Sequence, residues 1–277
     1  MINISNLRYS YRKQPALFEG LNLEIEYGRI SGVFGLNGAG KSTLMKLIMG
    51  LKNPKSDCIR VNGQKPFDRK PQLLADSYYL PEELPETNET PLWYAKYVGT
   101  LYPKFDQSLL DRLMMEFSLD ASKKISAMSY GQKKKFFIAF AISTGASLLI
   151  LDEPTNGLDI PSKSQFRRVI ASNMSDDKCI LISTHQVKVL ENLMDQVIIL
   201  KDAKVVFNQS IEKIQEHYLF TDSQPHGEVL YKEAGLGASR YVSINDKETA
   251  TKVDFELLFN GVISNPLNFN LATKTTW

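Results

Sequence analysis

Cysteine is scarce in this sequence. Its 277 residues include only Cys58 and Cys179, which lie far apart and have neither CxxC spacing nor a cluster of histidines around them. A disulfide framework or a structural zinc site needs paired or clustered ligands, so neither is expected here. We expect both thiols to be small buried side chains.

Long apolar segments are missing as well. The longest unbroken apolar run extends from Phe136 to Ile142, whereas a membrane-spanning helix needs about 20 residues. The first residues alternate apolar and polar side chains and lack the apolar core of a signal peptide. We therefore expect a cytoplasmic protein that does not itself cross the bilayer.

An excess of one charge is also absent. Lys and Arg number 33 against 31 Asp and Glu, which gives a formal net charge of +2. This balance argues against nucleic acid or an anionic membrane surface as the main partner. The hydrophobic share of 43% is ordinary for a globular protein, and a chain of this length can bury a sizeable core.

The apolar pattern predicts an α/β fold. Residues 1–11 and 21–25 alternate as two half-buried, antiparallel strands, and 53–88 read as loops and short strands. Helical periodicity then predicts a helical insert at about 88–135. Short apolar runs separated by helical stretches indicate a parallel sheet covered on both faces. The runs are 30–34, 148–151, 180–182 and 197–200.

The sequence predicts a large domain at 1–217 that contains the insert, and a small C-terminal appendage at 218–277. Glycine and polar residues dominate 221–251, where no strand is predicted. A short helix follows, for which Asp254 is a suitable N-cap.

A glycine-rich loop joins the strand at 30–34 to the following helix and fits the pattern GxxxxGK[ST]. Its glycines let backbone N–H groups turn toward phosphate oxygens, and the start of the helix adds its positive dipole end. Lys41 is expected to reach the β- and γ-phosphates of a nucleotide, and the Ser42 hydroxyl to ligate Mg²⁺. The predicted nucleotide-binding residues are Gly35, Leu36, Asn37, Gly38, Ala39, Gly40, Lys41, Ser42 and Thr43.

Two carboxylates end the apolar run at 148–151. Ligands bind at the carboxyl ends of strands in open α/β sheets, and Asp152 and Glu153 stand at such an end. Asp152 is suited to hold Mg²⁺, directly or through water. Glu153 is suited to polarise an attacking water as general base. The alternative, a solvent-exposed turn before Pro154, loses weight because a phosphate loop lies upstream.

The order of these motifs resembles the ATP-binding subunit of ABC transporters over about residues 1–210. Residues 128–132, MSYGQ, are similar to the LSGGQ signature, and residues 156–159, NGLD, to the D-loop. His185 is similar to the H-loop histidine at the end of the next strand. The resemblance implies a P-loop NTPase core with a mixed sheet, with ATP and Mg²⁺ as ligands.

The resemblance also implies a site completed by a second subunit. Ser129, with Gly131 and Gln132, would clamp ATP held by the phosphate loop of the partner, in a head-to-tail homodimer. A hydroxyl and free N–H groups at a helix start suit that role. Asp159 of the D-loop-like segment is assigned to nucleotide binding in the same way.

Two further assignments come from the resemblance. His185 would contact the γ-phosphate and join Glu153 and Lys41 as a catalytic residue. Tyr11 stands where the family has an aromatic ring that stacks on adenine, although Tyr9 competes for that role and packing is the ordinary use of a strand tyrosine.

The chain departs from the family pattern at three positions. Met128 replaces the leucine of the signature, and Tyr130 replaces a glycine, where a bulky ring could crowd the dimer interface. Glu82 stands where the family has the Q-loop glutamine. A carboxylate can still bind Mg²⁺, so we assign Glu82 to the metal together with Ser42 and Asp152. Glu83, or an exposed turn without function, is the alternative.

Two other segments keep open interpretations. The run from Lys133 to Lys135 fits a solvated helix face, or long-range attraction of ATP, and does not indicate nucleic-acid binding. Trp93, Tyr94 and Tyr97 lie on the first helix of the insert. The family implies a nearby groove for the membrane subunit, and core packing is an equal alternative.

We expect an Mg²⁺-dependent ATPase that powers a separate integral membrane permease and is attached through it to the inner face of the membrane. The compact insert and the appendage are more like those of exporters in this family. The alternatives are an ATP-binding switch, a soluble ABC-type ATPase without a transport role, and, least of all, a P-loop kinase of small molecules.

Overall fold

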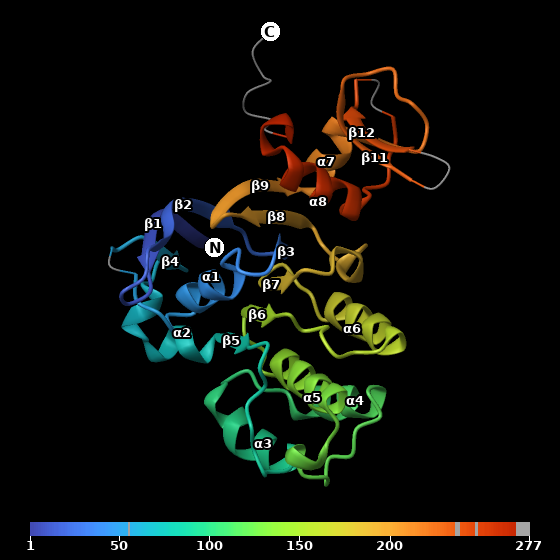
Figure 1. Cartoon of the computed structure of the whole chain (residues 1–277). Helices are drawn as coiled ribbons and strands as arrows, with labels where there is room; N and C mark the ends of the chain where they lie inside the picture. The colour runs from blue at the N-terminus through green and yellow to red at the C-terminus, as the bar shows by residue number, and fades with distance from the viewer. Residues whose placement is uncertain (55, 236–238, 247–248, 270–277) are drawn as a thin grey trace.

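A six-stranded sheet forms the centre of the protein. The computed structural model describes residues 1–269 except 55, 236–238 and 247–248. The strand order is β5-β6-β7-β3-β8-β9, in which β9 alone pairs antiparallel, so the sheet is mixed (Figure 1). All four predicted parallel runs lie in this sheet, which confirms the α/β fold class. The strands are β3 (Arg29–Gly35), β5 (Ser77–Leu80), β6 (Leu148–Asp152), β7 (Cys179–Thr184), β8 (Gln196–Lys201) and β9 (Lys204–Ser210).

Alternate side chains of the central strands enter two hydrophobic cores. In β6, Leu148 and Ile150 belong to one core, whereas Leu149 and Leu151 belong to the other. Each such strand is buried on both faces and therefore reads as a continuous apolar run. The two cores hold the carboxyl ends of the strands in a fixed arrangement, and these ends position the site.

The first core lies between the central sheet and an antiparallel sheet of order β2-β1-β4. Strands β1 and β2 are antiparallel, as the alternation predicted. Helix α1 fills this core with Leu44, Leu47 and Ile48. Its elements are β1 (Ile2–Ser10), β2 (Ala16–Ile25), α1 (Lys41–Ile48), β4 (Ile59–Val61), η1 (Pro66–Asp68) and α2 (Pro71–Ala75).

The helical insert lies at one end of the molecule, far from the C-terminal elements (Figure 1). Thr90 caps its first helix by accepting a hydrogen bond from the Trp93 N–H at 3.2 Å, as its sequence predicted. Phe140 packs against several aromatic rings in the centre of the insert. The elements are α3 (Pro91–Val98), η2 (Gly99–Leu101), α4 (Gln107–Glu116), η3 (Ile125–Ala127) and α5 (Tyr130–Ser143).

Ser129 and Gln132 begin helix α5 with a reciprocal pair of hydrogen bonds. The Ser129 Oγ accepts from the Gln132 N–H at 3.3 Å, and the Gln132 Oε1 accepts from the Ser129 N–H at 3.0 Å. This capping box satisfies two donors that a helix start otherwise leaves free. Helix α6 (Ile160–Ser172) begins in a similar way, with Asp159 as its N-cap.

The C-terminal part contains a second antiparallel sheet, of order β10-β12-β11, which the sequence did not predict. The helix expected after Asp254 is present as α8, and Asp254 caps it. The last eight residues of the predicted appendage lie outside the described residues, and its boundary at 218 stays a prediction. The elements are α7 (Ile211–His217), β10 (Tyr218–Thr221), β11 (Val229–Ala234), β12 (Ser239–Ile244), α8 (Phe255–Ser264) and η5 (Pro266–Phe269).

Helix α8 packs on η4 (Val187–Leu190), the short helix that follows His185, and on β8. The Lys188 Nζ lies 2.7 Å from Glu256 Oε2 across this contact. The second core therefore continues from the central sheet into the C-terminal part. Among the described residues, no helix is both long and apolar enough to span a membrane.

Candidate functional site

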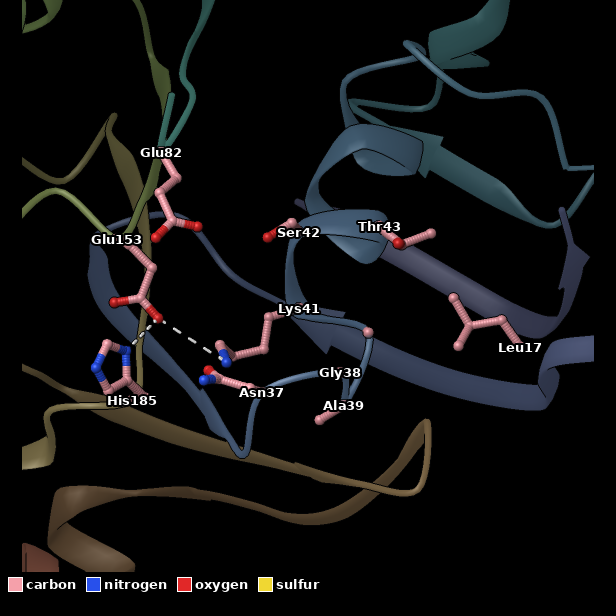
Figure 2. A pocket seen from close by; sticks show the side chains of 11 residues that line it. Leu17, Asn37, Gly38, Ala39, Lys41, Ser42, Thr43, Glu82, Glu153 and His185 are labelled. Atoms are coloured by element: carbon pink, nitrogen blue, oxygen red, sulfur yellow. Dashed lines mark hydrogen bonds and ion pairs between the residues drawn. The ribbon is translucent and has the colours of Figure 1, made fainter. Parts of the chain in front are cut away.

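A cavity of about 430 Å³ opens at the carboxyl ends of β3, β6 and β7 (Figure 2). The phosphate loop and the start of α1 form one wall, and side chains from three other segments form the opposite wall. Its volume lies in the range of small-ligand sites. The lining residues are Leu17, Asn37, Gly38, Ala39, Gly40, Lys41, Ser42, Thr43, Glu82, Glu153 and His185.

The predicted phosphate loop has the close packing that its glycines allow. A Cβ atom on Gly35 would lie 2.7 Å from the Leu200 carbonyl oxygen, so no larger residue fits there. Gly40 has φ 100°, a left-handed conformation that favours glycine. The loop then enters α1, whose first backbone N–H groups have no partner within the helix and are available to an anion.

Lys41 folds back over the phosphate loop. Its Nζ donates to the carbonyl oxygen of Gly35 at 2.8 Å and to that of Leu36 at 3.3 Å. It also lies 3.9 Å from Glu153 Oε1. Burial lowers the pKa of the Lys41 ammonium, although the nearby carboxylates of Glu153 and Asp152 oppose that shift. The Lys41 ammonium therefore lies beside the part of the cavity that phosphates would occupy.

Glu153 faces Lys41 across the cavity (Figure 2). Its Oε1 lies 2.9 Å from His185 Nδ1, whereas its buried Oε2 has no hydrogen-bond partner among the described residues. The backbone of Glu153 has φ 46°, which is uncommon for a residue other than glycine and costs of order 1–3 kcal/mol. A carboxylate that lines the cavity between a cation and an imidazole is suited to accept a proton.

Asp152 lies behind Glu153 and is not among the residues that line the cavity. Its Oδ1 accepts from the Ser183 hydroxyl, and its Oδ2 accepts from the Tyr79 hydroxyl at 3.0 Å. Burial, and then the nearby Asp152 charge, raise the pKa of Tyr79 and keep it a donor. With both oxygens engaged, Asp152 reaches a metal most readily through water, which was one of the two predicted modes.

Glu82, which the sequence assigned to the metal, lines the cavity beside Glu153. Its Oε1 accepts from Asn156 Nδ2 at 3.0 Å. Its backbone carbonyl accepts from the Tyr130 hydroxyl at 3.1 Å and from Lys134 Nζ at 3.0 Å. The loop of Glu82 is thus tied to residues that lie far away in the sequence.

The interpretation of the lysine run as a solvated helix face is wrong for Lys134, which is fully buried. Burial lowers the pKa of its ammonium to about 8, although Glu82, Asp152 and Glu153 oppose the shift. The helical period could have identified it, because Lys134 lies on the same face as Phe137, which is also buried.

The donors at the cavity fit Mg²⁺. Ser42 provides a hydroxyl and Glu82 a carboxylate on facing walls, and oxygen atoms are the ligands that this ion prefers. Among the described residues, no three His, Cys, Asp or Glu side chains form a group that could hold a metal ion.

The residues of the signature-like segment do not line this cavity. Ser129 and Gln132 cap helix α5, and Gly131 lies near the Gly157 carbonyl. Asp159 is exposed, and hydrogen bonds from Ser162 hold the pKa of its carboxyl below the usual value. These assignments stay predictions, and within one chain the segment is separate from the phosphate loop.

Tyr11 also lies beside the cavity rather than in its lining. Its hydroxyl is 2.8 Å from Thr43 Oγ1, and the Lys52 ammonium lies 4.6 Å from the centre of its ring. Leu17, which the sequence did not single out, does line the cavity. It lies at an irregular end of strand β2, where no motif marks it.

Comparisons with known proteins agree with this geometry. The profile of the family described as ABC transporter matches residues 18–156. The lantibiotic transport ATP-binding protein SrtF of Streptococcus pyogenes is 30% identical over 76% of this chain and 92% of its own length. The zinc uptake system ATP-binding protein ZurA of Listeria innocua is 29% identical over 79% of this chain and 89% of its own length.

A solved structure of an ATP-binding subunit of an ABC transporter is similar in fold as well as in sequence. It has a TM-score of 0.70 and 27% identity, and the match covers 77% of this chain and 91% of that one. The phosphate loop and the acidic residues Asp152 and Glu153 lie within the residues that the family profile matches. The chain therefore belongs to the ABC transporter family, as an ATP-binding subunit.

Proposed function

We propose that this chain hydrolyses ATP with Mg²⁺ and that hydrolysis drives transport by a separate integral membrane permease. One observation carries the proposal. Glu153, paired with His185 at 2.9 Å, lines the same cavity as Lys41 and Ser42 of the phosphate loop. A base and a phosphate cradle across one cavity are what hydrolysis of a terminal phosphate requires.

In the proposed reaction, the oxygen of a water molecule forms a bond to the γ-phosphorus while the bond to the leaving ADP breaks. The Glu153 carboxylate accepts the proton of that water, and His185 lies 2.9 Å from its Oε1. Lys41 neutralises charge on the β- and γ-phosphates. Ser42 and Glu82 would hold Mg²⁺, with Asp152 acting through water, and the ion would supply further charge neutralisation there.

We further propose that two copies of the chain close head to tail on two ATP molecules. Ser129 is exposed at the start of α5 and does not line the cavity of its own chain. A hydroxyl at an exposed helix start is suited to bind a phosphate brought by another molecule. Gly131, Gln132 and Asp159 would lie at the same interface.

The permease is proposed to dock on helix α3. Leu92, Trp93 and Tyr97 are exposed there, and the rings of Trp93 and Tyr97 pack at 4.7 Å. Exposed apolar side chains that gather on one helix favour a protein partner. Tyr94, by contrast, packs against Phe140 and belongs to the core of the insert. The chain would thereby be attached to the inner face of the membrane.

Export is the direction we propose, on the basis of the compact insert and the C-terminal part. Relatives include a lantibiotic transport protein and a zinc uptake protein, so they do not decide it. In a host strain without this chain, an exported compound should accumulate inside the cells. Depletion of that compound would instead indicate import.

The central experiment is static light scattering of Glu153→Gln with and without Mg²⁺-ATP, beside wild type and the remote control Glu212→Gln. Loss of the general base should lower kcat by at least about 100-fold and leave ATP binding intact. The trapped variant should double its mass only with ATP. A wild-type chain that binds ATP without hydrolysis would indicate a binding switch, and a persistent monomer would exclude the homodimer.

Docking on α3 is tested separately. Trp93→Glu should lower the amount of the chain in the membrane fraction of its host while ATP hydrolysis is retained. Met115→Glu, an equally drastic change at an exposed position of α4, is the matched control. Equal membrane association of both variants would contradict docking of the permease on α3.

A further inference from the structure

Lys134 is a buried cation that the reaction described above does not use. Its neighbours Lys133 and Lys135 are half-exposed, whereas Lys134 is fully buried. Its Nζ donates to the carbonyl oxygen of Glu82 at 3.0 Å and to that of Glu153 at 3.3 Å. An ammonium group loses strong hydration on burial, so a lysine is retained there at a cost in stability.

Both acceptors belong to residues whose carboxylates line the cavity. One ammonium therefore fixes the backbone positions of the proposed metal ligand Glu82 and the proposed base Glu153. The support matters most at Glu153, whose φ of 46° is strained. The Ser183 hydroxyl accepts from its N–H at 3.0 Å, and Lys134 binds its carbonyl, so both ends of this residue are held.

Tyr130 acts on the same loop from the same face of α5, one turn before Lys134. Its hydroxyl donates to the Glu82 carbonyl oxygen at 3.1 Å, and its ring lies 5.5 Å from Lys134 Nζ. The ring also covers Gly157, because a Cβ atom there would lie 2.5 Å from it. The side chain that departs from the signature pattern thus has specific contacts within its own chain.

We propose that Lys134, together with Tyr130, is a positioning residue for hydrolysis. The pair holds the backbone of Glu82 and Glu153 in place, which orients their carboxylates, and links both residues to the first two turns of α5. Ser129 caps the start of α5, so movement of the cap would shift the donors of Tyr130 and Lys134 and, with them, the carbonyl groups of the two acidic residues. This inference depends on the proposed ATPase function.

The test compares Lys134→Met with Lys133→Met. Methionine keeps an unbranched apolar stem but cannot donate to the two carbonyls, and both variants remove one positive charge from the same helix. We expect Lys134→Met to lower kcat by about 10-fold or more, with KM for Mg²⁺-ATP within about twofold of wild type. Lys133→Met should have the kcat of wild type.

Tyr130→Phe provides a second variant whose change at an exposed hydroxyl leaves folding intact. We expect a loss in kcat of about two- to fivefold, and a double variant that loses less than the product of the single losses, because both donors share one acceptor. If Lys134→Met does not fold, Tyr130→Phe decides the test. A Tyr130→Phe variant with the kcat of wild type would overturn the inference.

Other outcomes are also decisive. A Lys134→Met variant with a lower melting temperature but unchanged kcat would reduce Lys134 to a structural role and overturn the proposal. A raised KM with unchanged kcat would do the same. If the wild-type chain does not hydrolyse ATP, the proposed function fails first and this inference fails with it.

Discussion

Ser183 joins the two acidic residues of the site through one buried hydroxyl. It donates to Asp152 Oδ1 and accepts from the Glu153 N–H at 3.0 Å. Ser183→Ala removes both contacts without adding volume. The Glu153 N–H keeps a second acceptor, the Ser183 carbonyl oxygen at 3.2 Å, so most of the cost falls on the buried carboxylate of Asp152.

The magnitude follows from the charge on that acceptor. A hydrogen bond to a charged group contributes about 1.5–3 kcal/mol, and the Tyr79 hydroxyl still holds the other oxygen. We therefore expect the free energy of unfolding to fall by about 2 kcal/mol and the melting temperature by roughly 3–4 °C. The kcat should fall as well, because Asp152 is then held by the Tyr79 hydroxyl at only one of its two oxygens.

The assay is thermal and urea unfolding of Ser183→Ala beside Ser143→Ala. Both serines are fully buried, but the Ser143 hydroxyl donates only to the neutral Ala139 carbonyl oxygen at 2.8 Å. The control should lose less than about 1 kcal/mol. Equal unfolding midpoints for the two variants would refute the argument that the Asp152 charge makes the Ser183 contact the stronger one.

Two further pairs of variants test the phosphate loop and the clamp. Gly35→Ala brings a Cβ against the Leu200 carbonyl and should weaken ATP binding by about 10-fold or more in a direct titration, whereas Gly63→Ala, at a glycine with open space around it, should not. Ser129→Ala and Thr90→Ala each remove an N-cap and should each lower the free energy of unfolding by about 1 kcal/mol, but only Ser129→Ala should slow ATP hydrolysis. Equal hydrolysis by these two would count against a clamp at Ser129.

The parts of the fold that the sequence predicted are those that local pattern determines. The strands β6, β7 and β8 are buried on both faces, so their apolar runs are unmistakable. The phosphate loop is a contiguous motif. Helix starts at Thr90, Ser129 and Asp254 depend on residues within one turn, and all three caps are present.

The parts that the sequence could not predict depend on distant contacts. Strands β11 and β12 are short and mostly polar, and their pairing is set by packing against α8. Lys134 is buried because two carbonyl groups from other segments meet it. Tyr130 was expected to crowd a dimer interface, and its contacts with Glu82 and Gly157 arise only in the folded chain.

The contact between α8 and η4 has a consequence for how the protein folds during its synthesis. Domains fold from the N-terminus as synthesis proceeds, and all strands of the central sheet, which ends with β9 at Ser210, precede α8 in the chain. The apolar side chains of Val187 and Leu190 are buried in the finished structure, where α8 packs on η4. A nascent chain therefore leaves the segment next to His185 uncovered until α8 has left the ribosome, and this segment is the last part of the nucleotide site to be completed.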